Sequence, residues 1–149
     1  SLFLQELGLD HRVYRAARRT GRGEVLGYAG VIVVAGEGHV ATIAVDPRWH
    51  RHALGSRLLL DATRGAIVEG ATAMTLEVRS SNRAAQAMYA RFGYAPVGVR
   101  TGYYPRSGPD GRAEDAVIMW TDDITTDTSA ARLERIEAGL PGTTVWSAA

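Results

Sequence analysis

The sequence predicts a single domain of the α+β class, and three observations predict it. The chain has 149 residues, of which 46% are hydrophobic, and this suits one domain with a sizeable core. From Arg12 to Val45 it consists of β-rich segments joined by short turns, which is typical of an antiparallel meander. After Asp46-Pro47 apolar residues recur at helical spacing, and strands then alternate with helices up to Trp120.

Three strands are expected in the meander. They lie at residues 12–17, 24–34 and 39–45. Two turn-forming sequences separate them, Thr20-Gly21-Arg22-Gly23 and Ala35-Gly36-Glu37-Gly38.

Two helices and three further strands follow. An amphipathic helix to about Glu69 is predicted by apolar residues that recur every four positions, namely Leu54, Leu58, Ala62 and Ala66. A second helix is expected at residues 82–92, with Ser80, Ser81 or Asn82 as its N-cap. The strands are expected at residues 74–78, 94–99 and 116–120, with a loop rich in proline and glycine at residues 103–111.

The composition excludes several classes of protein and of site. Without cysteine there is no disulfide scaffold, no cysteine-ligated metal and no acyl-cysteine intermediate. The basic residues are all arginine, and a formal charge of +1 does not indicate a nucleic-acid binder. The four histidines form no helix-spaced pair, so no metal site is expected. No apolar run approaches the roughly 18 residues of a membrane span and no signal peptide opens the chain, so we expect a cytoplasmic protein.

A candidate anion site lies at residues 50–55. This HRHALG sequence follows a strand and opens a helix, so backbone N–H groups and the helix dipole would face an anion there. Arg51 and His52 would add positive charge. The alternative is a tight strand-to-helix turn in which Gly55 allows close packing.

Glu77 and Tyr89 are the residues most suited to acid–base chemistry. Glu77 interrupts an apolar strand, where a carboxylate is costly unless it faces a cavity or a partner. The alternative places it on the wet face of the strand. Tyr89 lies on the second helix, and its alternative is an ordinary core or surface tyrosine.

Five sequences occur in one order along the chain: TIAVDP, HRHALG, LEVRSSN, AMYARFGY and YYP. Together they resemble the GCN5-related N-acetyltransferases (GNAT), and within them the RimI-type branch, which acetylates the N-terminal alanine of a small-subunit ribosomal protein. The resemblance covers residues 24–120. It implies a mixed, mostly antiparallel sheet that splays open and is flanked by helices. It also implies direct transfer from acetyl-CoA to the N-terminal α-amine of a protein within a ternary complex.

Other functions stay open at this point. Within enzymes, the acceptor is alternatively another peptide, a lysine or a small amine. A CoA-binding module without turnover is the alternative from another class, although it does not need Glu77 or Tyr89. RNA binding through the arginines of residues 12–22 is disfavoured because few aromatic residues lie among them.

The resemblance implies roles for individual residues. Glu77 matches the general base and Tyr89 the general acid. Tyr103 and Tyr104 match tyrosines over the acceptor peptide, with ordinary loop packing as the alternative. The matched cofactor-binding positions are Ile43, Ala44, Val45, Arg51, His52, Ala53, Leu54, Gly55, Ser56 and Asn82.

Two positions depart from the family pattern. His50 stands where the family has Gln or Arg, and Ala53 stands where it has Gly. Because alanine lacks the freedom of glycine at positive φ, we expect the loop to form but to bind the cofactor less tightly. We also expect Glu24, Glu114 and Asp115 to attract a basic second residue of the acceptor peptide.

The two ends of the chain suggest an altered order of elements. Residues 1–7 resemble the second helix of the family and not its first strand. Residues 121–149 carry two arginines against five acidic residues, and they predict a strand at 124–128 and a helix at 129–138. We hypothesise a circular permutation of a single domain, in which residues 121–149 supply the displaced first strand and helix. The alternatives are a lost first segment with an acidic linker at 121–149, and a domain swap.

Overall fold

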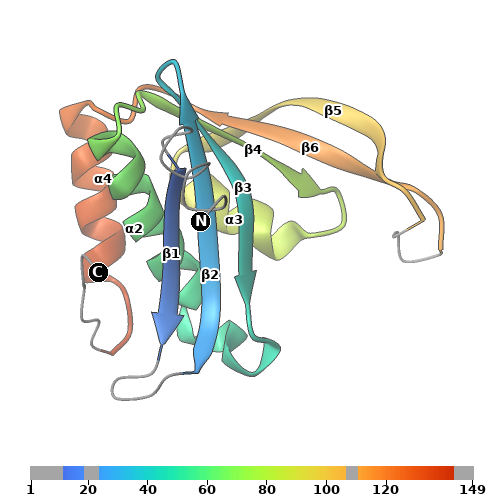
Figure 1. Cartoon of the computed structure of the whole chain (residues 1–149), viewed down its shortest axis with the longest axis horizontal. Helices are drawn as coiled ribbons and strands as arrows, with labels where there is room; N and C mark the ends of the chain where they lie inside the picture. Colours follow the sequence, from blue (N-terminus) through green and yellow to red (C-terminus); the bar gives the residue numbers. More distant parts are fainter. Residues whose placement is uncertain (1–11, 19–23, 107–110, 143–149) are drawn as a thin grey trace, which may run out of the picture.

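A computed structural model describes residues 12–18, 24–106 and 111–142, except for the side chains of residues 50–52. Six strands form one sheet in the order β1-β2-β3-β4-β6-β5 (Figure 1). The strands are β1 (Arg12–Arg18), β2 (Val25–Val34), β3 (Glu37–Val45), β4 (Ala73–Arg79), β5 (Tyr94–Tyr104) and β6 (Glu114–Thr121). The helices are the 3₁₀ helix η1 (Pro47–His52), α2 (Leu54–Val68), α3 (Arg83–Arg91) and α4 (Asp127–Ala138). No helix within the described ranges is both long and apolar enough to cross a membrane.

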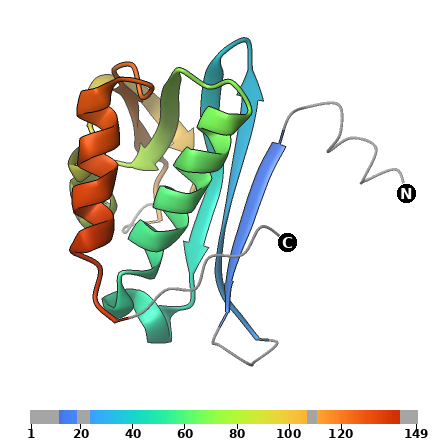
Figure 2. The same ribbon diagram turned by 90° about the vertical axis from the view of Figure 1, so that its left-hand side faces the viewer.

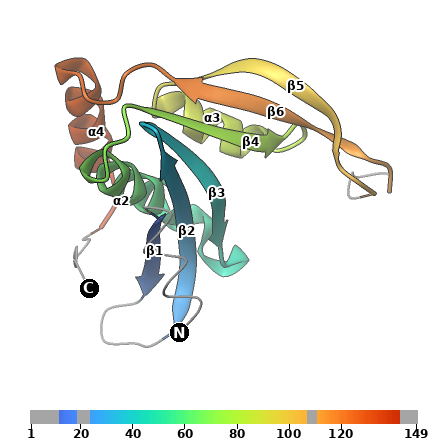
Figure 3. The same ribbon diagram turned by 45° about the horizontal axis from the view of Figure 1, so that its top comes forward.

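The predicted fold class is confirmed. Only β3 and β4 run parallel, and every other neighbouring pair is antiparallel. The β3–β4 pairing covers three residues of each strand and ends at His39 opposite Thr75. Beyond it the two strands diverge, and β4, β5 and β6 lead away from β1–β3 (Figure 3). The sheet is therefore mixed, mostly antiparallel and splayed, as expected.

The first half of the sheet and α2 enclose the centre of the core. Leu59, Ala62 and Ala66 of α2 are fully buried, and Val31 of β2 is buried with them. The alternation of the strands and the four-residue spacing of the helix supply these faces, as the sequence pattern indicates.

The second turn of the meander, between β2 and β3, is a two-residue hairpin. Ala35 and Gly36 both have positive φ, 50° and 81°, which is the conformation that two-residue hairpins require. Residues 37 and 38, expected in the turn, are the first residues of β3. The turn expected at residues 20–23 lies outside the described part.

The strand expected at residues 124–128 is wrong. Asp123 Oδ1 accepts hydrogen bonds from the backbone N–H and hydroxyl of Thr125, at 2.8 and 2.5 Å. The hydroxyl of Thr126 then accepts a hydrogen bond from Ser129 N at 3.1 Å and caps α4. These side chains give the backbone local partners that compete with strand pairing. The helix expected at 129–138 is confirmed and begins two residues earlier.

Helix α4 lies beside α2 on one face of the sheet (Figure 2). Its Leu133, together with Ile124, belongs to the same buried cluster as α2. The described part of residues 121–149 is thus packed and is not a linker. The permutation hypothesis required a strand from this segment beside β1, and in the described residues β1 pairs with β2 alone. Residues 1–7 and 145–149, on which the hypothesis also depended, lie outside the described part.

Candidate active site

The divergence of β3 and β4 leaves a groove of about 800 Å³. Its walls are residues 40–45 of β3 and 76–79 of β4, and its ends are the first turn of α2 and one face of α3. Each of the two parallel strands is followed by a helix that begins at this groove. The groove is a place where several segments far apart in the sequence meet.

Most of the residues predicted for the site line this groove. They are Ile43, Ala44, Val45, Ala53, Gly55, Ser56, Glu77, Asn82, Tyr89 and Tyr104. Leu54 does not line the groove, because its side chain is buried in the core. Tyr103 also lies outside the lining and is 44% exposed. Arg51 and His52 belong to η1, but their side chains lie outside the described part.

The groove end formed by α2 suits an anion. Ala53 is the N-cap of α2, no side chain caps the helix, and its first turn contains no acidic residue. The positive end of the helix dipole therefore faces the groove without a competing carboxylate. A Cβ at Gly55 would lie 3.2 Å from Met88 Sδ, so this glycine also lets α2 approach α3 closely. The anion and packing interpretations of the segment are compatible.

Ala53, which stands where the family has glycine, adopts a left-handed backbone conformation. Its φ and ψ are 54° and 27°, which is the left-handed region. An L-residue there brings its Cβ close to the following carbonyl oxygen. The loop forms in spite of this cost, as we expected.

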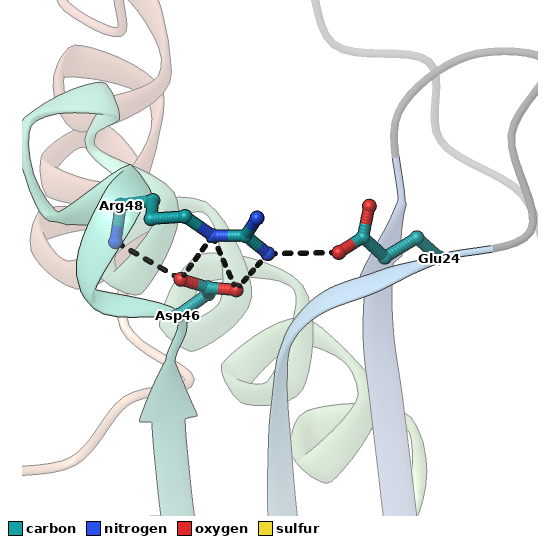
Figure 4. Close-up of polar contacts among 3 residues, drawn as sticks. All are labelled: Glu24, Asp46 and Arg48. Atoms are coloured by element: carbon teal, nitrogen blue, oxygen red, sulfur yellow. Dashed lines mark hydrogen bonds and ion pairs between the residues drawn. The ribbon is translucent and has the colours of Figure 1, made fainter.

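An ion-pair cluster holds the turn that precedes Ala53 (Figure 4). Arg48 Nη2 lies 2.6 Å from Asp46 Oδ2 and 2.8 Å from Glu24 Oε1, and Asp46 Oδ1 accepts a hydrogen bond from Arg48 N at 2.9 Å. The hydrogen bond to Asp46, followed by that to Glu24, raises the pKa of Arg48 above its ordinary value. The cluster joins the start of β2 to η1, which sequence analysis did not predict. Glu24, which we expected to attract a basic residue of the peptide, is thus already paired with Arg48.

Glu77 lines the groove and contacts two other strands. Its side chain is 14% exposed, and its Oε2 is 2.7 Å from Nε2 of His39 on β3. Arg100 Nη2 of β5 lies 3.8 Å from the other oxygen, Oε1. Glu77 therefore faces both a cavity and partners, which is the condition that sequence analysis set for a buried carboxylate at this position.

Tyr89 of α3 and Tyr104 of β5 both line the groove. Burial raises the pKa of Tyr89 to about 12, and Tyr104 contributes to that shift. Burial also raises the pKa of Tyr104, while Arg79, 4.2 Å above its ring, opposes that shift. Both phenols therefore keep their protons at neutral pH and can donate hydrogen bonds.

Tyr103 and Tyr104 end β5 instead of opening the predicted loop, because Tyr104 pairs with Glu114 of β6. Their rings meet edge to face at 5.0 Å, and Arg100 lies 5.5 Å from the ring of Tyr103. Glu114 accepts hydrogen bonds from Ser81 N and Oγ at 3.0 and 2.5 Å.

Asp115 is also engaged within the chain, because its Oδ1 accepts a hydrogen bond from Gly102 N at 2.9 Å. Each of the three carboxylates expected to attract a basic residue of the peptide therefore has a partner in the described structure.

His39, Arg79 and Arg100 are site residues that the sequence analysis missed. His39 was considered only as a metal ligand, and the part of the chain described by the structure gathers no group of three or more His, Cys, Asp or Glu suited to a metal. A glutamate in an apolar strand does predict a partner, but nothing in the sequence indicates which residue supplies it.

Asn82 has a role in the fold as well as a place in the groove. Its Oδ1 accepts a hydrogen bond from Ala85 N at 3.1 Å and caps α3, as predicted. Asn82 also lines the groove.

Comparison with known proteins identifies a family with this architecture. The model of the acetyltransferase (GNAT) family matches residues 2–94. A Mycobacterium tuberculosis protein named N-alpha-acetyltransferase RimI is 40% identical over 115 residues, which cover 72% of this chain and 68% of that protein. The Escherichia coli K12 [ribosomal protein bS18]-alanine N-acetyltransferase is 40% identical over 100 residues, covering 67% and 66%.

A solved structure shows the same relationship. The crystal structure of the ribosomal-protein-S18-alanine N-acetyltransferase from Escherichia coli superposes with a TM-score of 0.68 at 34% identity, covering 80% of this chain and 74% of that one. The matched part of this chain spans only 62–68% of the length of the first curated relatives.

Proposed function

This chain belongs to the GNAT family of acetyltransferases, and from that premise we propose that it transfers an acetyl group from acetyl-CoA to the N-terminal α-amine of a protein. The proposed acceptor is the N-terminal alanine of ribosomal protein bS18, which the names of its relatives specify for those proteins. Such an acceptor is made in the cytoplasm, so the enzyme would act there.

The groove suits acetyl-CoA along its whole length. The α2 N-terminus at Ala53, Gly55 and Ser56 would hold the pyrophosphate, with Arg51 and His52 from the preceding turn. Beyond His39 the described part of β3 no longer pairs with β4, and residues 43–45 of this segment, which line the groove, would contact the pantetheine arm. The amide group of Asn82 would contact the same arm. Acetyl-CoA supplies an activated thioester, and the remaining chemistry falls to side chains of the protein.

Glu77 is proposed as the general base. An amine attacks a thioester only when it is neutral, and an α-amine, with a pKa of about 7.7–8.0, loses its proton far more readily than lysine at about 10.4. As the new C–N bond forms and the C–S bond breaks, Glu77 takes the proton that the amine loses, directly or through one water. The position of the Glu77 side chain in the lining of the groove supports this role.

Tyr89 is proposed to stabilise the departing CoA thiolate. Its pKa of about 12 lies well above that of a thiol, about 8.5, so its phenol is the weaker acid. Complete proton transfer from Tyr89 is therefore uphill, and a hydrogen bond to the sulfur is the role that this environment favours. Tyr103 and Tyr104 would flank the acceptor peptide.

The single observation that carries the proposal is the position of Glu77 at the opening between β3 and β4, facing the groove that begins at the α2 N-terminus. The test is mass spectrometry of a peptide panel incubated with acetyl-CoA. The panel holds an alanine-starting bS18 peptide, the same peptide blocked at its N-terminus with a lysine added, and a small polyamine. Acetylation of the free α-amine alone is the expected result.

Two results would redirect the proposal. Acetylation of only lysine or the polyamine would show that the acceptor is a side-chain or small-molecule amine and not an α-amine. Tight acetyl-CoA binding with no acetylated product would favour a non-catalytic binding module. For the base, Glu77→Gln should lower kcat by about 10²-fold or more and leave acetyl-CoA binding, measured by calorimetry, near the wild-type value. An unchanged kcat would remove Glu77 from the role.

A further inference from the structure

The contact between His39 and Glu77 joins two strands that are distant in the sequence. His39 Nε2 and Glu77 Oε2 are 2.7 Å apart, and the residues are 38 positions apart in the chain. His39 forms the last parallel pair with Thr75, so it stands at the point where β3 and β4 separate. It does not line the groove, whereas Glu77 does.

The two oxygens of Glu77 have different surroundings. Oε2 is held by His39, and since an ionised carboxylate only accepts hydrogen bonds, the His39 nitrogen facing it carries the proton. Within the described residues no hydrogen bond reaches Oε1. Its nearest cation is Arg100 Nη2 at 3.8 Å, beyond hydrogen-bond distance. Oε1 is thus the oxygen left to receive a proton.

We propose that His39 is a positioning residue for the base: its Nε2–H fixes Oε2 of Glu77 and so presents Oε1 to the acceptor amine. A glutamate side chain has three rotatable bonds, and a base must lie within hydrogen-bond reach of the proton that it removes. His39 is 41% exposed against 14% for Glu77, so it reaches the carboxylate from the solvent side without occupying the groove. This inference rests on the proposed function, because it assigns Glu77 as the base.

The test compares His39→Ala with His39→Gln, whose amide nitrogen restores a donor at the position of Nε2. His39→Ala should lower kcat about tenfold or more, which is within the range of losses caused by misplacing a catalytic group, with the KM for acetyl-CoA unchanged. His39→Gln should recover most of the loss. Glu37→Gln is the matched control, because Glu37 is an exposed residue on the same strand and face, and it should behave as wild type.

A double-mutant cycle separates positioning from a general structural effect. In a Glu77→Gln background there is no carboxylate base to position, so adding His39→Ala should cost no further activity. If His39→Ala alone leaves kcat unchanged, or if it lowers kcat by the same factor in both backgrounds, the proposal is overturned.

A second measurement does not depend on turnover. ¹H–¹⁵N correlation spectra of the imidazoles in the free protein should show His39 protonated at Nε2, and Glu77→Ala should speed the exchange of that proton with water, because its hydrogen-bond acceptor is lost. A wild-type His39 protonated at Nδ1 alone would overturn the proposal even in an active enzyme. If instead the wild type acetylates no member of the peptide panel while the tautomer is as expected, the proposed function fails and the contact stands.

Discussion

Ala53→Gly tests whether the left-handed turn before α2 carries a local cost that the protein tolerates. Ala53 has φ 54° and ψ 27° and lines the groove at the α2 N-terminus. A left-handed L-residue costs about 1–2 kcal/mol, which glycine does not incur. Glycine in turn gives the unfolded chain more freedom, which offsets about 0.4–1 kcal/mol. The net gain in the free energy of unfolding should be about 0.5–1 kcal/mol.

Ala35→Gly provides a control with the same backbone geometry. Ala35 has φ 50° in the β2–β3 hairpin, and the nine residues of β3 separate it from the Ala53 turn by roughly 30 Å. Both variants should therefore gain a similar stability, measured by urea unfolding followed by circular dichroism. The gain corresponds to a rise in Tm of about 1–4 °C for a chain of this length.

Only the groove variant should alter ligand binding. Removing the Ala53 methyl group clears space beside the proposed phosphate position and frees the turn, so the Kd for acetyl-CoA, measured by calorimetry, should fall for Ala53→Gly and stay constant for Ala35→Gly. If Ala53→Gly loses stability while Ala35→Gly gains it, the strain argument is refuted. If both variants bind acetyl-CoA more tightly, the gain in affinity does not come from the Ala53 turn, and the argument that the Ala53 methyl group weakens binding is refuted.

Two further predictions concern the core. Tyr89 has a pKa of about 12 when folded and about 10 when unfolded, so the unfolded state loses its proton first and stability falls as the pH rises above 10. Between pH 8 and 11, the free energy of unfolding, measured with urea, should fall by about 1 kcal/mol less for Tyr89→Phe than for wild type. An equal fall in both proteins would contradict the raised pKa of Tyr89. Leu133→Ala should cost about 2–5 kcal/mol if α4 is part of the core, whereas the exposed Glu134→Ala should change stability by less than about 0.5 kcal/mol. A small effect of Leu133→Ala would show that α4 contributes little.

Local patterns in the sequence predict most of the elements of this fold. Alternation predicts β1 to β4 to within two residues at each end, and four-residue spacing predicts α2, because these periods follow from the geometry of strands and helices. The failure at residues 124–128 has a local cause as well. The side chains of Asp123 and Thr126 hydrogen-bond the backbone of residues two or three positions away, and the apolar and threonine-rich composition that favours a strand does not reveal those bonds.

The candidate site also contains some residues that local motifs predict and some contacts that they do not. The α2 N-terminus, Glu77 and Tyr89 belong to short contiguous motifs, so their places along the chain are predictable. The partners of Glu77 are not predictable from the sequence, because His39 meets it only through the parallel pairing of β3 with β4, and Arg100 only through the β5–β6 hairpin. Contacts of this kind depend on sheet order, which no local period encodes.

The position of the groove follows from the single parallel pair in the sheet. Parallel strands need a crossover connection, and here α2 provides it between β3 and β4. The carboxyl ends of both strands therefore point the same way, and the helices that follow them both begin at the groove. Of α2 and α3, α3 has a side-chain cap, from Asn82, whereas α2 begins without one at Ala53. An anion in the groove is therefore favoured at the α2 N-terminus, whereas Glu77 lies on the β4 wall of the same groove.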